Sequence, residues 1–285
     1  MPVVLIDGDG ATAEIVDVLQ DVSLARSMLP RAAMRSLVAA MVLVTCVLAA
    51  PSVSADAAKP WCAPEVNELS DHVCYVDGGT PADGRHTLVI YLHGALAKRP
   101  GFAYMQQRAM ALHAKKHSFT VVIPTGPSDG VGFVWPASPK DLKEKEPEVL
   151  AGIQKARADV EKRVGHSFDE TFVVGFSSGA YYGSSLALRS ALDVDGYIVL
   201  AGGAGWVPPA EGSGKRAPVF VGVSAADPLS ANHSRGMAGA LAGMHWPYRA
   251  EERAVGHGVD WTFMAHGIAW LRERSPRAIA RTAER

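Results

Sequence analysis

The chain has 285 residues, of which 48% are hydrophobic and 20% are charged, so it can fill a core and is not a disordered chain. Its 28 Lys and Arg residues against 29 Asp and Glu residues give a net charge of −1, which argues against a nucleic-acid-binding protein. The length suits one large α/β domain or two small ones, and we find no internal repeat that indicates a solenoid or a propeller.

The first predicted element is an export signal over residues 34–55. Basic residues precede an uncharged apolar run of 14 residues at 37–50, and the small residues Val53-Ser54-Ala55 follow it. This order is typical of a secretory signal peptide, so we expect cleavage after Ala55 and a secreted or periplasmic protein. The alternative is an uncleaved membrane anchor, although a bilayer span needs about 20 apolar residues.

Residues 1–33 form an unusually long leader ahead of this signal. Met34 is followed by Arg35, which is an ordinary beginning for a signal peptide, and Met28 is a second possible start. We therefore interpret residues 1–33 as an over-extended reading frame that contributes no domain.

Two cysteines remain after removal of the signal, Cys62 and Cys74. An even number of cysteines in an exported chain indicates a disulfide, which would hold the N-terminal segment 56–86. A metal site with His72 is the alternative, but two thiols and one imidazole at this spacing match no common ligand pattern. We expect the disulfide and no metal.

Short apolar runs that are rich in β-forming residues then alternate with helical patterns. Because the runs are nearly continuously apolar, they are typical of parallel strands that are covered on both faces. The expected strands are Thr87–Leu92, Phe119–Ile123, Thr171–Val174, Gly196–Leu200, Pro218–Val223 and a weaker one at Tyr248–Val255. The expected helices are Tyr104–Lys116, Pro147–Val164, Ala180–Ala191, Gly236–Met244 and Ala265–Arg272.

This alternation predicts an α/β fold with a mostly parallel central sheet flanked by helices, formed by residues 87–275 and followed by a tail at 276–285. Ligands of such sheets bind outside the carboxyl ends of the strands, so functional residues should directly follow the predicted strands.

Gly175-Phe176-Ser177-Ser178-Gly179 follows one predicted strand and opens a predicted helix. The pentapeptide G-x-S-x-G is a weak signal alone, but between a strand and a helix it is typical of a nucleophile elbow, which exposes a serine on a tight turn. We expect Ser177 to be a nucleophile. The alternative is an unreactive turn rich in glycine and serine.

A serine nucleophile needs a base and an acid that orients the base. Asp227 follows the fifth predicted strand and His257 the sixth, with 50 residues between Ser177 and Asp227 and 30 between Asp227 and His257. Asp260 is the alternative acid, but it precedes the last predicted helix, and we interpret it as the N-cap of that helix. We therefore predict a Ser177, Asp227 and His257 triad.

Attack on a carbonyl creates an oxyanion that needs two N–H donors. The amide of Ser178, directly after the nucleophile, is one candidate. The loop after the first core strand reads His93-Gly94-Ala95-Leu96, and it offers the amide of Ala95 first and that of Leu96 second.

Leu92-His93-Gly94, the elbow pentapeptide, Asp227 and Gly256-His257-Gly258 together resemble the α/β-hydrolase superfamily. The resemblance covers about 87–272. Within the superfamily, the chain resembles secreted esterases related to polyhydroxyalkanoate depolymerases and feruloyl esterases, and the carboxylesterase and dienelactone hydrolase group. It departs from the depolymerases at Ala180-Tyr181-Tyr182 and lacks their Cys after His-Gly.

The resemblance implies an exported serine ester hydrolase that works through an acyl-enzyme on a small-molecule or short polymer ester. A serine peptidase, a thioesterase, a polyester depolymerase and a non-catalytic binding protein on the same fold are the alternatives. Leu96, Trp135 and Trp206 are candidate substrate-binding residues because they follow strands, with loop packing as the alternative. We expect no cofactor, no nucleic-acid partner and no membrane contact beyond an uncleaved signal segment.

Overall fold

The computed structural model describes residues 60–79, 81–99, 101–209 and 216–274 of the chain. The predictions for residues 1–33, for the signal at 34–55 and for the tail at 276–285 lie outside the described residues. Within the described ranges, no helix is long and apolar enough to cross a membrane.

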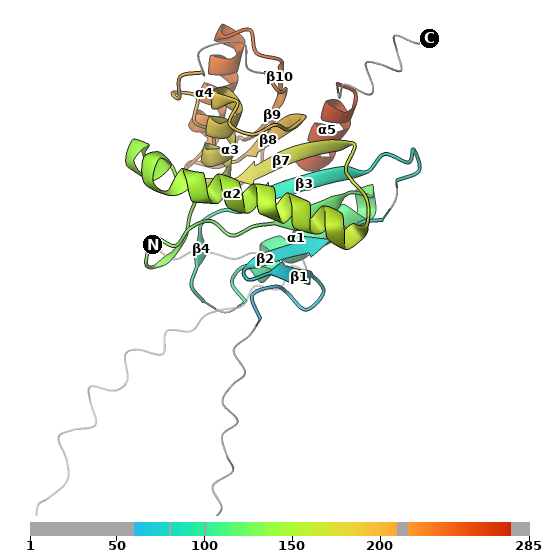
Figure 1. The fold of residues 1–285 in the computed structure, drawn as a ribbon. Coiled ribbons are helices and arrows are strands. Elements are labelled where there is room, and N and C mark those ends of the chain that lie inside the picture. The colour runs from blue at the N-terminus through green and yellow to red at the C-terminus, as the bar shows by residue number, and fades with distance from the viewer. Residues whose placement is uncertain (1–59, 80, 100, 210–215, 275–285) are drawn as a thin grey trace, which may run out of the picture. The chain divides into compact units, whose positions relative to one another are not determined.

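An eight-stranded sheet runs through the centre of this part of the chain (Figure 1), in the order β1-β2-β5-β3-β7-β8-β9-β10. The six strands from β5 to β10 in this order are parallel, whereas β1 and β2 join one edge in antiparallel pairing. This is the predicted mostly parallel sheet. The strands are β1 (Asn67–Ser70), β2 (Val73–Val76), β3 (Thr87–Leu92), β5 (Thr120–Ile123), β7 (Glu170–Phe176), β8 (Gly196–Leu200), β9 (Val219–Ser224) and β10 (Tyr248–Arg253).

Helices cover both faces of the sheet, as the apolar strands require. Successive strand residues point to opposite faces: Leu88 and Ile90 pack with α2, α3 and α4, whereas Val89 and Tyr91 pack with α1 and α5. Because the six strands are parallel, the loops that follow them all lie at the same edge of the sheet. The helices are α1 (Tyr104–His117), α2 (Pro139–Val164), α3 (Ser178–Arg189), α4 (Ala231–Gly243) and α5 (Trp261–Arg272).

Four helices begin earlier than the sequence indicates, and one of them, α3, begins at Ser178, two residues before the predicted start. α2 begins at Pro139, where the Ser138 side chain accepts a hydrogen bond from the Asp141 amide, so Pro147 lies inside the helix instead of at its start. α5 begins at Trp261 because Asp260 caps it. α4 begins at Ala231, five residues before the predicted start. In α2 and α4 the first turns are mostly polar and so escape an apolar pattern, whereas α5 begins with the apolar Trp261 and Phe263 ahead of the predicted start at Ala265.

Four short strands were not predicted. β1 and β2 form an antiparallel edge hairpin, and β4 (Leu96–Ala97) pairs with β6 (Gly132–Phe133) in a separate two-stranded sheet. β6 lies between the predicted strand Phe119–Ile123 and the predicted helix Pro147–Val164, where no element was predicted. These strands have two to four residues each, too few for a periodic apolar pattern to appear.

The predicted disulfide between Cys62 and Cys74 is confirmed. It ties the segment before β1 to β2, and both cysteines are buried against the α1 side of the sheet. The bond therefore attaches the N-terminal segment to the core.

Candidate active site

Ser177 lies at the tight turn between β7 and α3 with φ 51° and ψ −116°, a strained backbone conformation for a residue other than glycine. The neighbouring glycines make the turn possible. A Cβ at Gly175 would lie 2.2 Å from the Gly179 carbonyl oxygen, and a Cβ at Gly179 would lie 2.0 Å from the Leu92 carbonyl oxygen. The pentapeptide thus packs the elbow directly against the end of β3.

Ser177, His257 and Asp227 form one chain of hydrogen bonds. His257 Nε2 lies 3.1 Å from Ser177 Oγ, and His257 Nδ1 lies 2.7 Å from Asp227 Oδ2. The residues follow β7, β10 and β9, so three strand ends bring together side chains that are 30 to 80 residues apart. Because Nδ1 faces a carboxylate, it carries the ring proton and leaves Nε2 able to accept one from Ser177.

Asp227 is fully buried, whereas the His257 side chain is 34% exposed. Burial opposes ionisation of the Asp227 carboxyl, but hydrogen bonds from Ser230 and His257 favour the charged form more strongly and lower its pKa below the usual value. The Leu229 amide donates to the other carboxylate oxygen at 2.9 Å. Asp227 is therefore a fixed anion beneath His257.

The two predicted oxyanion donors belong to the start of α3 and to the loop after β3. Ser178 is the first residue of α3, and Ala95 is an exposed residue in the loop after β3. Neither amide hydrogen-bonds to another residue in the described part of the chain, so both can donate to a ligand. The Gly94 backbone packs against the elbow, because a Cβ there would lie 3.3 Å from Ser177 Cβ.

His93 fixes the position of this loop. The sequence motif includes His93 but did not indicate the hydrogen bonds that its ring makes. The Gly126 amide donates to His93 Nε2 at 2.9 Å, so the proton of the neutral ring lies on Nδ1, 2.6 Å from the Gly94 carbonyl oxygen. Burial lowers the pKa of His93 to about 4, so the ring is neutral at pH 7. It joins the loops after β3 and β5.

Two further side chains hold the same loop. Gln106 on α1 accepts hydrogen bonds from the Gly94 amide at 3.1 Å and from the Tyr91 hydroxyl at 2.9 Å. Trp135 donates its indole N–H to the His93 carbonyl oxygen at 2.9 Å and its amide to Ser178 Oγ at 3.2 Å. Nothing in the local sequence marks these contacts, because each partner is 12 to 43 residues away.

The three candidate substrate-binding residues lie in different environments. Leu96 is buried in β4, and Trp135 is buried with its ring stacked on Tyr182. Trp206 is 65% exposed and contacts the rings of Tyr181 and His233. Of the three, Trp206 is the side chain that solvent and a ligand can reach.

Asp260, the alternative acid, and His266, a histidine nine residues after His257, have other roles. Asp260 accepts hydrogen bonds from the amides of Thr262 and Phe263 and so caps α5. His266 pairs with Glu251 at 2.7 Å on the surface. The described residues contain no group of three or more His, Cys, Asp and Glu side chains that could hold a metal ion.

Comparisons with known proteins bear on the fold. No family model and no curated protein matches the chain. The structure of YahD with malic acid superposes with a TM-score of 0.52 at 13% identity, covering 71% of this chain and all of that one. A carboxylesterase from Mesorhizobium loti superposes with a TM-score of 0.50 at 19% identity, covering 73% of this chain and 99% of that one. The chain therefore has the α/β-hydrolase fold.

Proposed function

We propose that the protein is a serine hydrolase that cleaves carboxylic esters, with Ser177 as nucleophile, His257 as general base and Asp227 as the group that orients His257. The observation that carries this proposal is the hydrogen-bonded chain from Ser177 Oγ through His257 to Asp227 at a strained elbow. Structural likeness to a carboxylesterase supports the choice of esters over amides.

In the proposed reaction, His257 Nε2 takes the proton of Ser177 as Oγ attacks the ester carbonyl carbon. The carbonyl oxygen becomes an oxyanion that accepts hydrogen bonds from the Ala95 and Ser178 amides. When the tetrahedral intermediate collapses, the alkoxide leaves with the proton from His257. His257 then deprotonates a water molecule, which attacks the acyl-enzyme and restores Ser177.

The proposal predicts that Ser177→Ala lowers kcat by about 10⁶-fold, because the nucleophile is lost, while the circular dichroism spectrum stays unchanged. The measurement is hydrolysis of p-nitrophenyl esters of short, medium and long acyl chains. Ser167→Ala, in the exposed loop before β7 and so at the opposite end of that strand from the elbow, is the control and should retain full activity. Equal activity of Ser177→Ala and wild type would overturn the assignment.

Covalent labelling with a fluorophosphonate separates an inert hydrolase fold from an enzyme whose substrate is not among the esters tested. Labelling of wild type but not of Ser177→Ala would support an activated serine. Labelling without ester hydrolysis would direct attention to amides and polyesters. Activity that falls with acyl chain length would favour small soluble esters, and contact with Trp206 is then the first substrate interaction to test by Trp206→Ala.

We further propose that the protein acts outside the cytoplasm. The disulfide between Cys62 and Cys74 is compatible with that location, since such bonds persist in oxidising compartments. Mass spectrometry of the N-terminal peptide of exported protein should find Asp56 as the first residue. A peptide from residues 1–27 in the native protein would contradict both the cleavage and the proposed start.

A further inference from the structure

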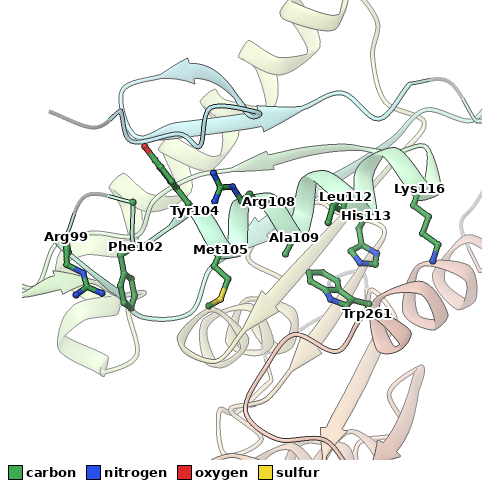
Figure 2. A pocket seen from close by; sticks show the side chains of 11 residues that line it. Arg99, Phe102, Tyr104, Met105, Arg108, Ala109, Leu112, His113, Lys116 and Trp261 are labelled. Carbon is green, nitrogen blue, oxygen red and sulfur yellow. The ribbon is translucent and has the colours of Figure 1, made fainter. Parts of the chain in front are cut away.

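A groove of about 850 Å³ runs along the outer face of α1 (Figure 2). Its lining includes none of Ser177, Asp227 and His257, so it is a separate surface from the candidate active site. Trp261, the first residue of α5, borders the groove opposite α1 and stacks on His113 with ring centroids 3.9 Å apart. The stacked rings of Trp261 and His113 therefore form part of the groove wall.

Large apolar side chains gather in this groove. Seven such side chains are exposed in the described ranges, and three of them line it: Phe102 at 40%, Met105 at 65% and Leu112 at 70% exposure. Met105 and Leu112 are seven residues apart on α1, which places them two turns apart on one face of the helix. Isolated exposed apolar residues need no explanation, but a contiguous set marks an interaction site.

The charged side chains that line this groove are basic. Arg99, Arg108 and Lys116 are among the lining residues, and no acidic residue is. Glu65 pairs with Arg108 and neutralises part of its charge. Arg99 and Lys116 lie at opposite ends of the groove, and the Arg99 guanidinium lies 5.6 Å from the centroid of the Phe102 ring. Cations thus flank an apolar stripe, a pattern that complements a negatively charged, apolar partner.

We propose that the α1 groove docks on the surface of an anionic phospholipid bilayer. Phe102, Met105 and Leu112 enter the boundary between headgroups and acyl chains, and Trp261 lies at the same level, where indole rings are favoured. Arg99 and Lys116 contact the lipid phosphates. This inference does not depend on the proposed ester hydrolysis, because it uses no residue of the active site.

The test places a nitroxide spin label at Leu112→Cys or, as control, at Leu229→Cys, in the full chain with Cys46→Ser. Leu229 is 72% exposed but lies outside the groove, so the two sites are matched in residue type and exposure. The paramagnetic accessibility of each label to oxygen and to a water-soluble nickel complex is measured with vesicles of phosphatidylcholine alone and with added phosphatidylglycerol. Because the readout is local, any insertion of the run at 37–50 does not mask it.

We expect the label at position 112 to become accessible to oxygen and protected from nickel with phosphatidylglycerol vesicles, while the label at 229 stays in water. Lys116→Gln should lower the fraction of inserted label by about fivefold, the effect of one basic residue near an anionic surface. Lys155→Gln replaces an exposed lysine of α2 and should leave the fraction of inserted label unchanged. A label at position 112 that stays in water would overturn the proposal. Spectral broadening between two labels at position 112 without vesicles would also overturn it, because it would show that two copies of the chain contact each other there.

Discussion

At the scale of single residues, Asp227 and Asp260 show how two carboxylates close in the fold differ in role. Asp227 is buried and contacts the ring of His257, whereas Asp260 uses Oδ1 to cap α5 and also pairs with Arg253 at 3.4 Å. In the proposed mechanism, the negative charge of Asp227 therefore contributes to catalysis, whereas that of Asp260 does not.

Asp227→Asn should therefore lower kcat for ester hydrolysis by about 10⁴-fold, because an amide favours the wrong tautomer of His257 and does not stabilise its protonated form. Asp260→Asn is the matched control: asparagine is as good a helix cap as aspartate, so activity and stability should remain close to wild type. Steady-state kinetics of both variants test this. A comparable loss in the two variants would contradict the assignment of Asp227.

The glycines at the elbow allow a second prediction at this scale. Gly179→Ala places a methyl group 2.0 Å from the Leu92 carbonyl oxygen, so backbone must move, and we expect a lower free energy of unfolding by about 2 kcal/mol or more, with loss of activity. Gly183→Ala in the same helix meets its first neighbour at 3.6 Å and should be neutral or stabilising by up to about 1 kcal/mol. Urea unfolding monitored by fluorescence measures both. Equal stability of the two variants would show that the elbow tolerates the methyl group.

At the scale of elements, an ion pair joins α2 to α3. Arg189 donates two hydrogen bonds to Glu146, at 2.6 and 2.8 Å, and these side chains are only 25% and 12% exposed. Glu146 immediately precedes Pro147 in the interior of α2. The pair thus anchors α2 where proline removes a helical hydrogen bond.

Arg189→Ala should lower the free energy of unfolding by about 2 kcal/mol, because it leaves a nearly buried carboxylate without its cation. The exposed pair of Arg235 and Glu252 is also bidentate, with side chains 44% and 50% exposed, so Arg235→Ala should lower the free energy of unfolding much less than Arg189→Ala does. Chemical denaturation of both variants makes the comparison. If Arg235→Ala costs as much as Arg189→Ala, burial is not what distinguishes the two pairs.

At the scale of the whole molecule, buried neutral histidines make stability depend on pH. Burial lowers the pKa of His93 to about 4, and burial together with the charges of His117 and Lys116 lowers the pKa of His113 to about 4. The unfolded chain titrates these groups near pH 6.5. Between about pH 4 and 6.5 the unfolded chain therefore binds more protons than the folded chain.

Stability should consequently be highest above about pH 6.5 and fall as the pH drops toward 4, by up to about 1.4 kcal/mol per pH unit for each histidine. His113→Gln removes one of these groups and should reduce the slope in that window. His266→Gln, at a surface histidine that is half exposed, should leave the slope closer to wild type. Thermal unfolding across this pH range tests both variants, and an unchanged slope in His113→Gln would contradict the burial argument.

The parallel sheet and the elbow could be predicted from the sequence, because both depend on local patterns. Strands such as Thr87–Leu92 and Gly196–Leu200 have the same bounds in the structure as in the prediction, since a short apolar run that is buried on both faces leaves little alternative. The positions of Ser177, Asp227 and His257 after β7, β9 and β10 could be predicted for the same reason. The structure places these three side chains in hydrogen-bonding contact.

The residues that support that site could not be predicted from the sequence and are identified by the contacts in the folded chain. The contacts of His93 with Gly126, of Trp135 with Ser178 and of Gln106 with Gly94 join segments that carry no mark of one another in the sequence. The same is true of the α1 groove, whose apolar and basic residues come from a loop, a helix and the start of α5. Long-range packing brings these groups together, and a periodic pattern within one element does not reveal it.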